Sequence, residues 1–466
     1  MRIVMFSMTP LFPDRSMGGA QKQLKKVALY LAEQGHDVTI LCTRRSDANM
    51  PFHWHPNLEI VPIFRFKQPF PEPYATEVYN IASAIQDVGD YLDRADVFYS
   101  HDGGLIFPYV YQDTPAIISL RSILFSETLQ SGFLFQGDGL VVPSQHTVDS
   151  WLATVGRFFP ELKNRMHVIH NGLDFSEYRP CSFDDLADRL KLEPQRYQYI
   201  LYPHRPDDAK GIRQTIAVAD RLVHQYGLHD IRVLVPQWID TGLADHVLAY
   251  YRSLQEEIAQ HGLTDYFVFH DWISDSDMPQ YFSLGTVTFA LGNYVETFGN
   301  TPYESLACGT PVIVASVGPY RDMLPDNLVA KVNYGDSEEA ARLAADILQN
   351  RQRTSDDTMH WLHENFKQDD MVRTYADLIL NARKLGPMPY VHHHLDPETV
   401  AFRLAPWCVV TGDSIYHDFL GTYNDDAQLV RCAIRGQVTA KDCSPDQLIA
   451  WYREGYWVPI FPDEAE

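Results

Sequence analysis

Two glutamates, Glu296 and Glu304, stand eight residues apart in the segment from Phe289 to Pro311 and flank a Phe-Gly-Asn turn. Carboxylates accept hydrogen bonds from the hydroxyl groups of sugars and riboses. The backbone N–H groups that open a helix face anions such as phosphate. The segment therefore has the groups that a polyhydroxylated ligand carrying phosphate would need.

Glu304 also has a purely structural interpretation. Residues Thr301 to Glu304 have the pattern of a capping box, with Thr at the N-cap, Pro at the first helical position and Glu at the third. On this alternative, Glu304 only caps a helix that ends near Gly309, before a buried strand over 312–315. Capping does not account for Glu296, which precedes the helix in a loop.

Two cations, Arg205 and Lys210, lie in the loop over 202–211, between an expected strand and an expected helix. A phosphate group bound at this loop would carry negative charge. Each cation about 4 Å from that charge contributes roughly 4 kcal/mol of attraction at an effective dielectric near 20. The alternative is that both cations form surface ion pairs with Asp207 and Asp208, and such pairs contribute little.

Further candidate residues follow strands expected in the N-terminal half. Gly18 and Gly19, in the loop over 16–20, let backbone N–H groups approach a phosphate, or simply form a tight turn. Arg121 follows a strand and could bind an anionic group of an acceptor or of a donor. His101 also follows a strand and could orient a substrate or act as a base, although a histidine at such a place is more often structural.

Taken in order along the chain, these motifs resemble those of the retaining GT-B glycosyltransferases, glycosyltransferase family 4. The resemblance covers about residues 1–385 and includes the interdomain turn from Val168 to Asp174. It implies transfer of a sugar from a UDP- or GDP-linked donor to an unidentified acceptor, with retained configuration and without a cofactor or metal. Asp275-Ser276-Asp277 precedes an expected helix and is expected to cap it, since Ser and Asp are ordinary helix caps. His392 to His394 have no carboxylate or cysteine at a metal-ligand spacing and are expected to form a polar linker.

The resemblance also implies a role for each candidate residue. Arg205 and Lys210 would bind the donor diphosphate, Glu296 the donor sugar and Glu304 the ribose. The Gly18-Gly19 loop would lie near the diphosphate and the reacting sugar. The backbone N–H groups that would face sugar hydroxyls or phosphate are those around Phe298, Gly299 and Asn300.

The chain departs from the family pattern on the acceptor side. Family members often carry a catalytic-site histidine after the strand that corresponds to 116–120, where this chain has Arg121. His101 and Arg121 are therefore both candidates for the missing catalytic role. The departure favours one alternative, a non-catalytic subunit that binds sugar nucleotides, which the intact donor motif disfavours. A nucleotide-sugar epimerase of the same fold is a second alternative.

The elements that must position these residues alternate between strand and helix, which predicts an α/β fold of the GT-B type. It has two Rossmann-like doubly wound domains facing a cleft, with ligands at the carboxyl ends of the strands. The predicted parts are an acceptor-side domain over 1–172, a nucleotide-sugar domain over 173–365, a helix crossing back over 366–386 and a small C-terminal domain over 387–466.

The last of these parts lies outside the family resemblance. Its clearest element is a helix over 445–454, which a capping box beginning at Ser444 opens. The segment is rich in aromatic residues and is expected to be winged-helix-like. We expect it to bind the acceptor or a partner.

The bulk composition limits the partners and the compartment. The net charge of -23 disfavours binding to nucleic acid. The six cysteines form no C-x-x-C pair, which argues against zinc and disulfides and favours the reducing cytoplasm. No apolar run approaches about 18 residues. Membrane contact is therefore expected to be peripheral at most, at the inner face. Lys22, Lys25 and Lys26 cluster on the first expected helix and could touch an anionic membrane or an acceptor, but such a cluster more often forms only a solvated helix face.

Overall fold

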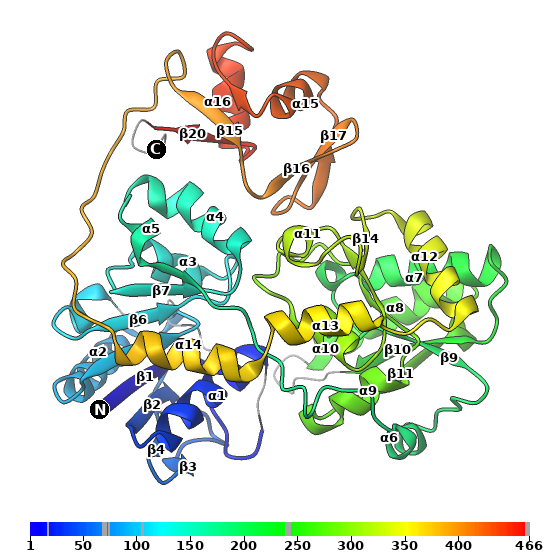
Figure 1. The fold of residues 1–466 in the computed structure, drawn as a ribbon, viewed down its shortest axis with the longest axis horizontal. Coiled ribbons are helices and arrows are strands. Elements are labelled where there is room, and N and C mark those ends of the chain that lie inside the picture. The colour runs from blue at the N-terminus through cyan, green and yellow to red at the C-terminus, as the bar shows by residue number, and fades with distance from the viewer. Residues whose placement is uncertain (16–17, 68–71, 73–74, 104–106, 238–243, 462–466) are drawn as a thin grey trace. The chain divides into compact units, whose positions relative to one another are not determined.

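The computed structural model describes residues 1–15, 18–67, 72, 75–103, 107–237 and 244–461 (Figure 1). The chain divides into two compact units. The first joins Met1–His170 to Val372–Glu466, and the second is Asn171–Met371. The first division lies two residues from the boundary expected after residue 172. Each unit contains a Rossmann-like sheet, so the predicted α/β class with two such domains is confirmed.

The first unit is built on an eight-stranded sheet in the order β3-β4-β2-β1-β5-β6-β7-β8. All neighbouring strands are parallel except β3 and β4. The strands are β1 (Arg2–Ser7), β2 (Asp37–Thr43), β3 (Phe52–His55), β4 (Leu58–Phe64), β5 (Val97–His101), β6 (Ala116–Ser119), β7 (Gly139–Val142) and β8 (Met166–Val168).

Helices accompany the strands of this sheet, as its buried apolar strands require. The helix α1 (Gly19–Glu33) buries Leu24, Val27, Ala28 and Leu31, whose i, i+3, i+4, i+7 spacing places them on one helix face. The other helices of this sheet are α2 (Val78–Leu92), α3 (Ser126–Phe133), α4 (Gln145–Thr154) and α5 (Leu162–Arg165) with the 3-10 turns η2 (Pro108–Tyr111) and η3 (Val155–Arg157).

The second unit has a six-stranded sheet, parallel throughout, in the order β11-β10-β9-β12-β13-β14. Its strands are β9 (Gln198–Leu201), β10 (Ile231–Gln237), β11 (Phe267–Asp271), β12 (Val287–Ala290), β13 (Val312–Ala315) and β14 (Ala330–Val332). The strand predicted over 312–315 is confirmed residue for residue.

The helices of the second unit pack an apolar core against both faces of this sheet. They are α6 (Asp184–Arg189), α7 (Ile212–His224), α8 (Ala244–Gln260), α9 (Met278–Leu284), α10 (Asn300–Ala307), α11 (Tyr320–Met323), α12 (Ser337–Asn350) and α13 (Asp356–Asn365), with the 3-10 turns η4 (Asp208–Lys210), η5 (Thr264–Tyr266) and η6 (Asp275–Asp277). The unit boundary falls within α14 (Gln368–Leu380), inside the range expected for the crossing helix.

The C-terminal segment has two three-stranded antiparallel sheets, β19-β15-β20 and β16-β17-β18. Its elements are β15 (Ala401–Leu404), β16 (Cys408–Thr411), β17 (Ser414–His417), β18 (Thr422–Asn424), α15 (Ala427–Ile434), β19 (Gln437–Val438), α16 (Pro445–Arg453) and β20 (Trp457–Ile460). The predicted cap of α16 is confirmed, since the Ser444 side chain accepts a hydrogen bond from the Gln447 N–H. The winged-helix likeness stays a prediction.

No helix in the part of the chain that the structure describes is long and apolar enough to cross a membrane.

Candidate active site

The strand order of the second unit marks where a ligand site is expected. Strands β9 and β12 are neighbours, and the chain continues outward from them in opposite directions, to β10 and to β13. In doubly wound sheets, ligands bind at the carboxyl ends of the strands at such a switch point. The cation loop follows β9 and the glutamate loop follows β12, so the topology brings both loops to this point.

The two loops meet by a close approach of their backbones. The Tyr294 N–H donates to the carbonyl oxygen of Ala209, at 2.8 Å. A Cβ atom on Gly292 would collide with that same carbonyl. Gly211 has a φ of 89°, and a Cβ atom there would lie 2.5 Å from the backbone nitrogen of Gly292. Only glycine fits both positions, which fixes η4 against the loop after β12.

This contact places Lys210 beside Glu296. The Lys210 ammonium donates to a Glu296 carboxylate oxygen at 2.5 Å, and both side chains are about a quarter exposed. The ammonium also lies 3.6 Å from the centre of the Tyr294 ring, within the range of a cation–π interaction. Two residues that sequence analysis assigned to the diphosphate and to the sugar are thus in direct contact.

Arg205 lies at the exposed edge of the same loop. Its side chain is 53% exposed, and its guanidinium is 3.9 Å from an Asp207 carboxylate oxygen. The Asp207 side chain also caps η4, since it accepts a hydrogen bond from the Ala209 N–H at 2.9 Å. The surface ion pair between Arg205 and Asp207, which was the alternative to ligand binding, is therefore present. The distance between its charged groups is long, and both side chains are about half exposed.

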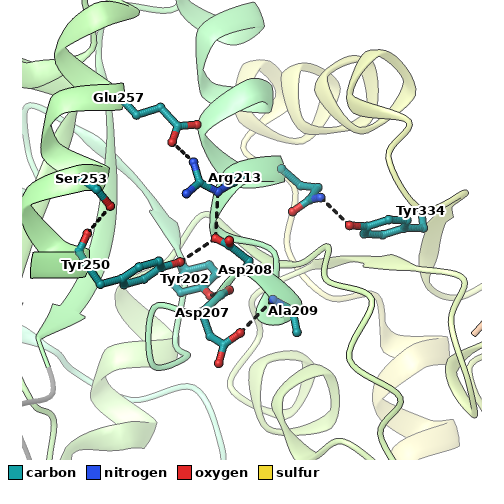
Figure 2. A network of polar contacts seen from close by, with 10 residues as sticks. Tyr202, Asp207, Asp208, Ala209, Arg213, Tyr250, Ser253, Glu257 and Tyr334 are labelled. Atoms are coloured by element: carbon teal, nitrogen blue, oxygen red, sulfur yellow. Dashed lines mark hydrogen bonds and ion pairs between the residues drawn. The ribbon is translucent and has the colours of Figure 1, made fainter. Parts of the chain in front are cut away.

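A polar network that sequence reasoning missed connects η4 to the helices α7 and α8 (Figure 2). One Asp208 carboxylate oxygen accepts from Arg213 Nε at 2.9 Å and from the Tyr250 hydroxyl at 2.7 Å. Arg213 pairs in turn with Glu257. Tyr250 and Glu257 belong to α8, far along the chain from η4, so no local pattern could have revealed the network.

The predicted capping box at Glu304 is wrong. Helix α10 begins at Asn300, its N-cap is Gly299, and no side chain bonds to the cap. Glu304 is therefore the fifth residue of the helix and lies half-buried. The helix starts early because Gly299 adopts a φ of 75° and turns the chain into it.

Tyr320 connects the two glutamates. Its hydroxyl lies against Gly299, where a Cβ atom would collide with it. Burial raises the pKa of Tyr320 well above its ordinary value, and the negative charges of Glu296 and Glu304 raise it further. Both carboxylates thus act on one buried hydroxyl, which remains a hydrogen-bond donor.

The residues between the glutamates are held by packing and by one amide contact. Phe298 is buried, and its ring stacks on Tyr303 with centres 4.5 Å apart. Its side chain therefore supports the loop. Asn300 Oδ1 accepts from Asn171 Nδ2 at 2.7 Å, which fixes the first residue of α10.

In the first unit, β1 and β5 are neighbours at the corresponding switch point. Gly18 is the N-cap of α1, and Gly19 is its first residue, with open space around the Gly18 Cα. The glycines thus lie at a helix start, where N–H groups face outward. Ser16 and Met17, in the same predicted motif, lie outside the described residues.

His101 ends β5 and is buried. Its Nε2 lies 2.8 Å from the carbonyl oxygen of Ala20, and its Nδ1 lies 2.8 Å from the Tyr99 hydroxyl. A carbonyl only accepts, so Nε2 carries the proton and Nδ1 accepts from Tyr99. Burial, and then the charge of Arg121, lower the pKa of His101 to about 3. This is the geometry of a neutral, structural histidine, and its catalytic role stays a prediction.

Arg121 is tied to two residues that sequence reasoning missed. Its backbone N–H donates to an Asp102 carboxylate oxygen at 3.2 Å, and its guanidinium donates to the Tyr375 hydroxyl at 3.2 Å. Tyr375 belongs to α14, more than 250 residues away, so only the fold reveals the contact. Burial raises the pKa of Asp102 to about 6, although the Arg121 charge opposes the shift.

Both halves of the chain match known families. Residues 17–177 match the family described as Glycosyltransferase Family 4, and residues 185–368 match the one described as Glycosyl transferases group 1. YtcC of Bacillus subtilis, named as a glycosyltransferase, is 24% identical over 210 residues, which are 43% of this chain and 50% of that protein. The chain thus spans about half the length of that curated relative.

Solved structures share the fold. Sucrose-phosphate synthase from Thermosynechococcus elongatus superposes with a TM-score of 0.66 at 17% identity, over 81% of this chain and 98% of that one. HepE of Anabaena, in complex with UDP and glucose, superposes with a TM-score of 0.62 at 16% identity, over 82% of this chain and 99% of that one. At such identities the likeness shows the fold alone. The predicted GT-B fold is thereby confirmed.

Proposed function

Since the chain belongs to the group 1 glycosyltransferases of GT-B fold, we propose that it transfers a sugar from a UDP- or GDP-linked donor to an acceptor, with retained configuration. The observation that carries this proposal is the 2.5 Å contact between Lys210 and Glu296 at the switch point of the second unit. One loop thus presents a cation where the other presents a carboxylate. A diphosphate and the sugar attached to it need that pair of groups.

The donor would bind to the second unit. Lys210 and Arg205 would attract the diphosphate, Glu296 would accept from sugar hydroxyls and Glu304 from the ribose. Preorganised cations contribute most where negative charge develops, which here is the departing phosphate. These cations supply the charge that a divalent metal supplies in other transferases, so the proposal includes no metal. HepE, a structural neighbour, is a protein solved with UDP and glucose.

The proposed reaction breaks the bond between the anomeric carbon and the donor phosphate oxygen. The acceptor hydroxyl oxygen forms its bond to the same carbon from the same face, and its proton passes to the departing phosphate oxygen. The step needs no protein base. His101 is not available as a base, because its two ring nitrogens are already engaged with Tyr99 and Ala20. A step without a protein base is compatible with this arrangement.

The first unit would supply the acceptor side. Gly18 and Gly19 present a helix start, and Arg121 presents a part-buried guanidinium that suits an anionic group. The aromatic segment over 387–466 is the second candidate for acceptor recognition. We place the reaction in the cytoplasm, because none of the six cysteines, all of them described, forms a disulfide.

The test is to incubate the protein with UDP-glucose, UDP-N-acetylglucosamine or GDP-mannose, with water as the acceptor, and to follow the released sugar by proton NMR before it mutarotates. Retention predicts that the first anomer formed is that of the donor. The opposite anomer would contradict retention. An epimerised donor without release would favour the epimerase, and binding without turnover would favour the non-catalytic subunit.

A further inference from the structure

His204 precedes Arg205 in the cation loop, and the fold of that loop leaves its ring in a defined place. Pro203 and Pro206 flank it and restrict the backbone. The hydroxyl of Tyr202 lies 3.4 Å from the carbonyl oxygens of Arg205 and Asp207, so the loop curls around that ring. The His204 ring meets the Tyr202 ring edge-on, with centres 5.4 Å apart.

The polar atoms of this imidazole have no protein partner. Within the described part of the chain, neither ring nitrogen of His204 takes part in a hydrogen bond, although the side chain is half-buried. Among the described residues, the side-chain nitrogens and oxygens that are fully buried without a partner do not include those of His204. Both ring nitrogens are therefore available to bond to water or to a ligand that enters the cation loop.

The charged group that acts on His204 is Lys210. Burial, and then the charge of Lys210, lower the pKa of His204 to about 3. Lys210 itself pairs with Glu296, and Arg205, which follows His204 in the sequence, lies near Asp207. The imidazole is therefore neutral and lies near the positive charge of Lys210.

We propose that His204 contacts the diphosphate of the donor, to which one ring nitrogen donates a hydrogen bond while the other takes up a proton as the diphosphate binds. The inference rests on the proposed function and names a third phosphate-binding side chain.

The proposal predicts a particular pH dependence. The bound diphosphate brings negative charge to the ring, which raises the pKa of the imidazole above its value in the unliganded protein. A group that gains a proton on binding makes the affinity rise as the pH falls through its pKa in the complex. If that pKa reaches about 7, binding is roughly tenfold tighter at pH 6 than at pH 8.

The experiment is isothermal titration of the full chain with UDP-glucose and with GDP-mannose, at pH 6 and pH 8, in two buffers of different ionisation enthalpy. An intact nucleotide sugar has no phosphate group that titrates in this range. The wild type should bind the preferred donor about tenfold more tightly at pH 6 and take up a proton. His204→Gln keeps an N–H donor but cannot be protonated, so it should lose the uptake and the pH dependence while binding within about threefold at pH 8.

His360→Gln is the matched control, because His360 is 74% exposed on α13 and pairs only with Glu364 among the contacts of its side chain given by the structure. It should keep the wild-type pH profile. The same uptake and profile in His204→Gln as in the wild type would overturn the inference, as would an equal loss in His360→Gln. If His204→Gln does not fold, His204→Asn replaces it. Failure of the wild type to bind either donor would overturn the proposed function, and this inference with it.

Discussion

At the scale of single residues, the structure separates the two roles considered for Glu304. The carboxylate lies within α10 and the helix cap is Gly299, so capping does not compete with ligand binding. Glu296, Arg205, Lys210 and Glu304 could be chosen as candidates from sequence because they stand in short motifs, and their roles stay predictions. The contacts of Tyr320 with Gly299 and of Tyr375 with Arg121 could not be predicted, because only the folded chain makes them.

Asp102 provides a prediction at this scale. Its φ of 63° and its burial hold the carboxyl next to the Arg121 backbone, and its pKa is raised to about 6. Between pH 4 and pH 6 the folded chain therefore keeps a proton that the unfolded chain releases, so this group lowers stability as the pH rises. Asp102→Asn, which tolerates the same φ and still accepts a hydrogen bond, removes this cost.

We expect Asp102→Asn to raise the free energy of unfolding at pH 7.5 by about 1–2 kcal/mol, and the gain to vanish near pH 4. Urea unfolding at a series of pH values measures it. Asp113→Asn, an exposed position, is the control and should change little at any pH. A destabilised Asp102→Asn at pH 7.5 would show that the Arg121 charge outweighs burial.

At the scale of elements, strands and helices with strong periodicity were predicted correctly. The strand predicted over 312–315 is β13, and the helix predicted over 445–454 is α16, which ends one residue earlier. The elements that were missed have little pattern of their own. The strand β3, Phe-His-Trp-His, is a short edge strand that depends on pairing with β4. The strands of the C-terminal segment are two to four residues long and depend on their partners in the same way.

The turn η4 gives a prediction at this scale. Helix α8 holds η4 through the hydrogen bond from Tyr250 to Asp208, and η4 carries Lys210. Tyr250→Phe removes one hydrogen bond to a carboxylate, which we expect to cost about 1 kcal/mol. Lys210 would then be less well placed, and the dissociation constant for the donor should rise about fivefold.

Fluorescence or calorimetric titration of the donor checks this prediction. Tyr79→Phe is the matched control, because Tyr79 is 66% exposed on α2 in the first unit. It should bind the donor like the wild type. Equal affinities of Tyr250→Phe and Tyr79→Phe would show that α8 does not position the cation loop.

At the scale of the whole chain, the C-terminal segment is packed into the first unit. The apolar core of the segment includes Ala153 of α4. His146 and Asp418 form a pair at 3.8 Å in which both side chains are buried, and Arg157 donates to the Tyr452 hydroxyl at 3.2 Å. Composition could not reveal this packing, because its contacts join residues about 270–300 positions apart. The segment therefore contributes to stability, whatever its part in acceptor recognition.

Tyr452→Phe tests this contribution. Loss of the hydrogen bond from Arg157 should lower the free energy of unfolding by about 1 kcal/mol, measured by urea unfolding with a first-unit fluorescence probe. Tyr390→Phe is the control, because Tyr390 is 64% exposed and a phenylalanine keeps its stacking on Phe158. Identical unfolding curves for Tyr452→Phe and the wild type would contradict the contribution.

The central claim is that the loops after β9 and β12 form one site for a nucleotide sugar. Equilibrium titration of the wild type, Lys210→Ala and Glu304→Gln with UDP- and GDP-linked sugars tests it most directly, with Glu338→Gln, an exposed position on α12, as the control. We predict that the wild type and the control bind at least one donor equally well, and that each of the other two variants binds it at least tenfold more weakly, as expected for the loss of a charged hydrogen bond. Unchanged affinity in both variants would contradict the claim.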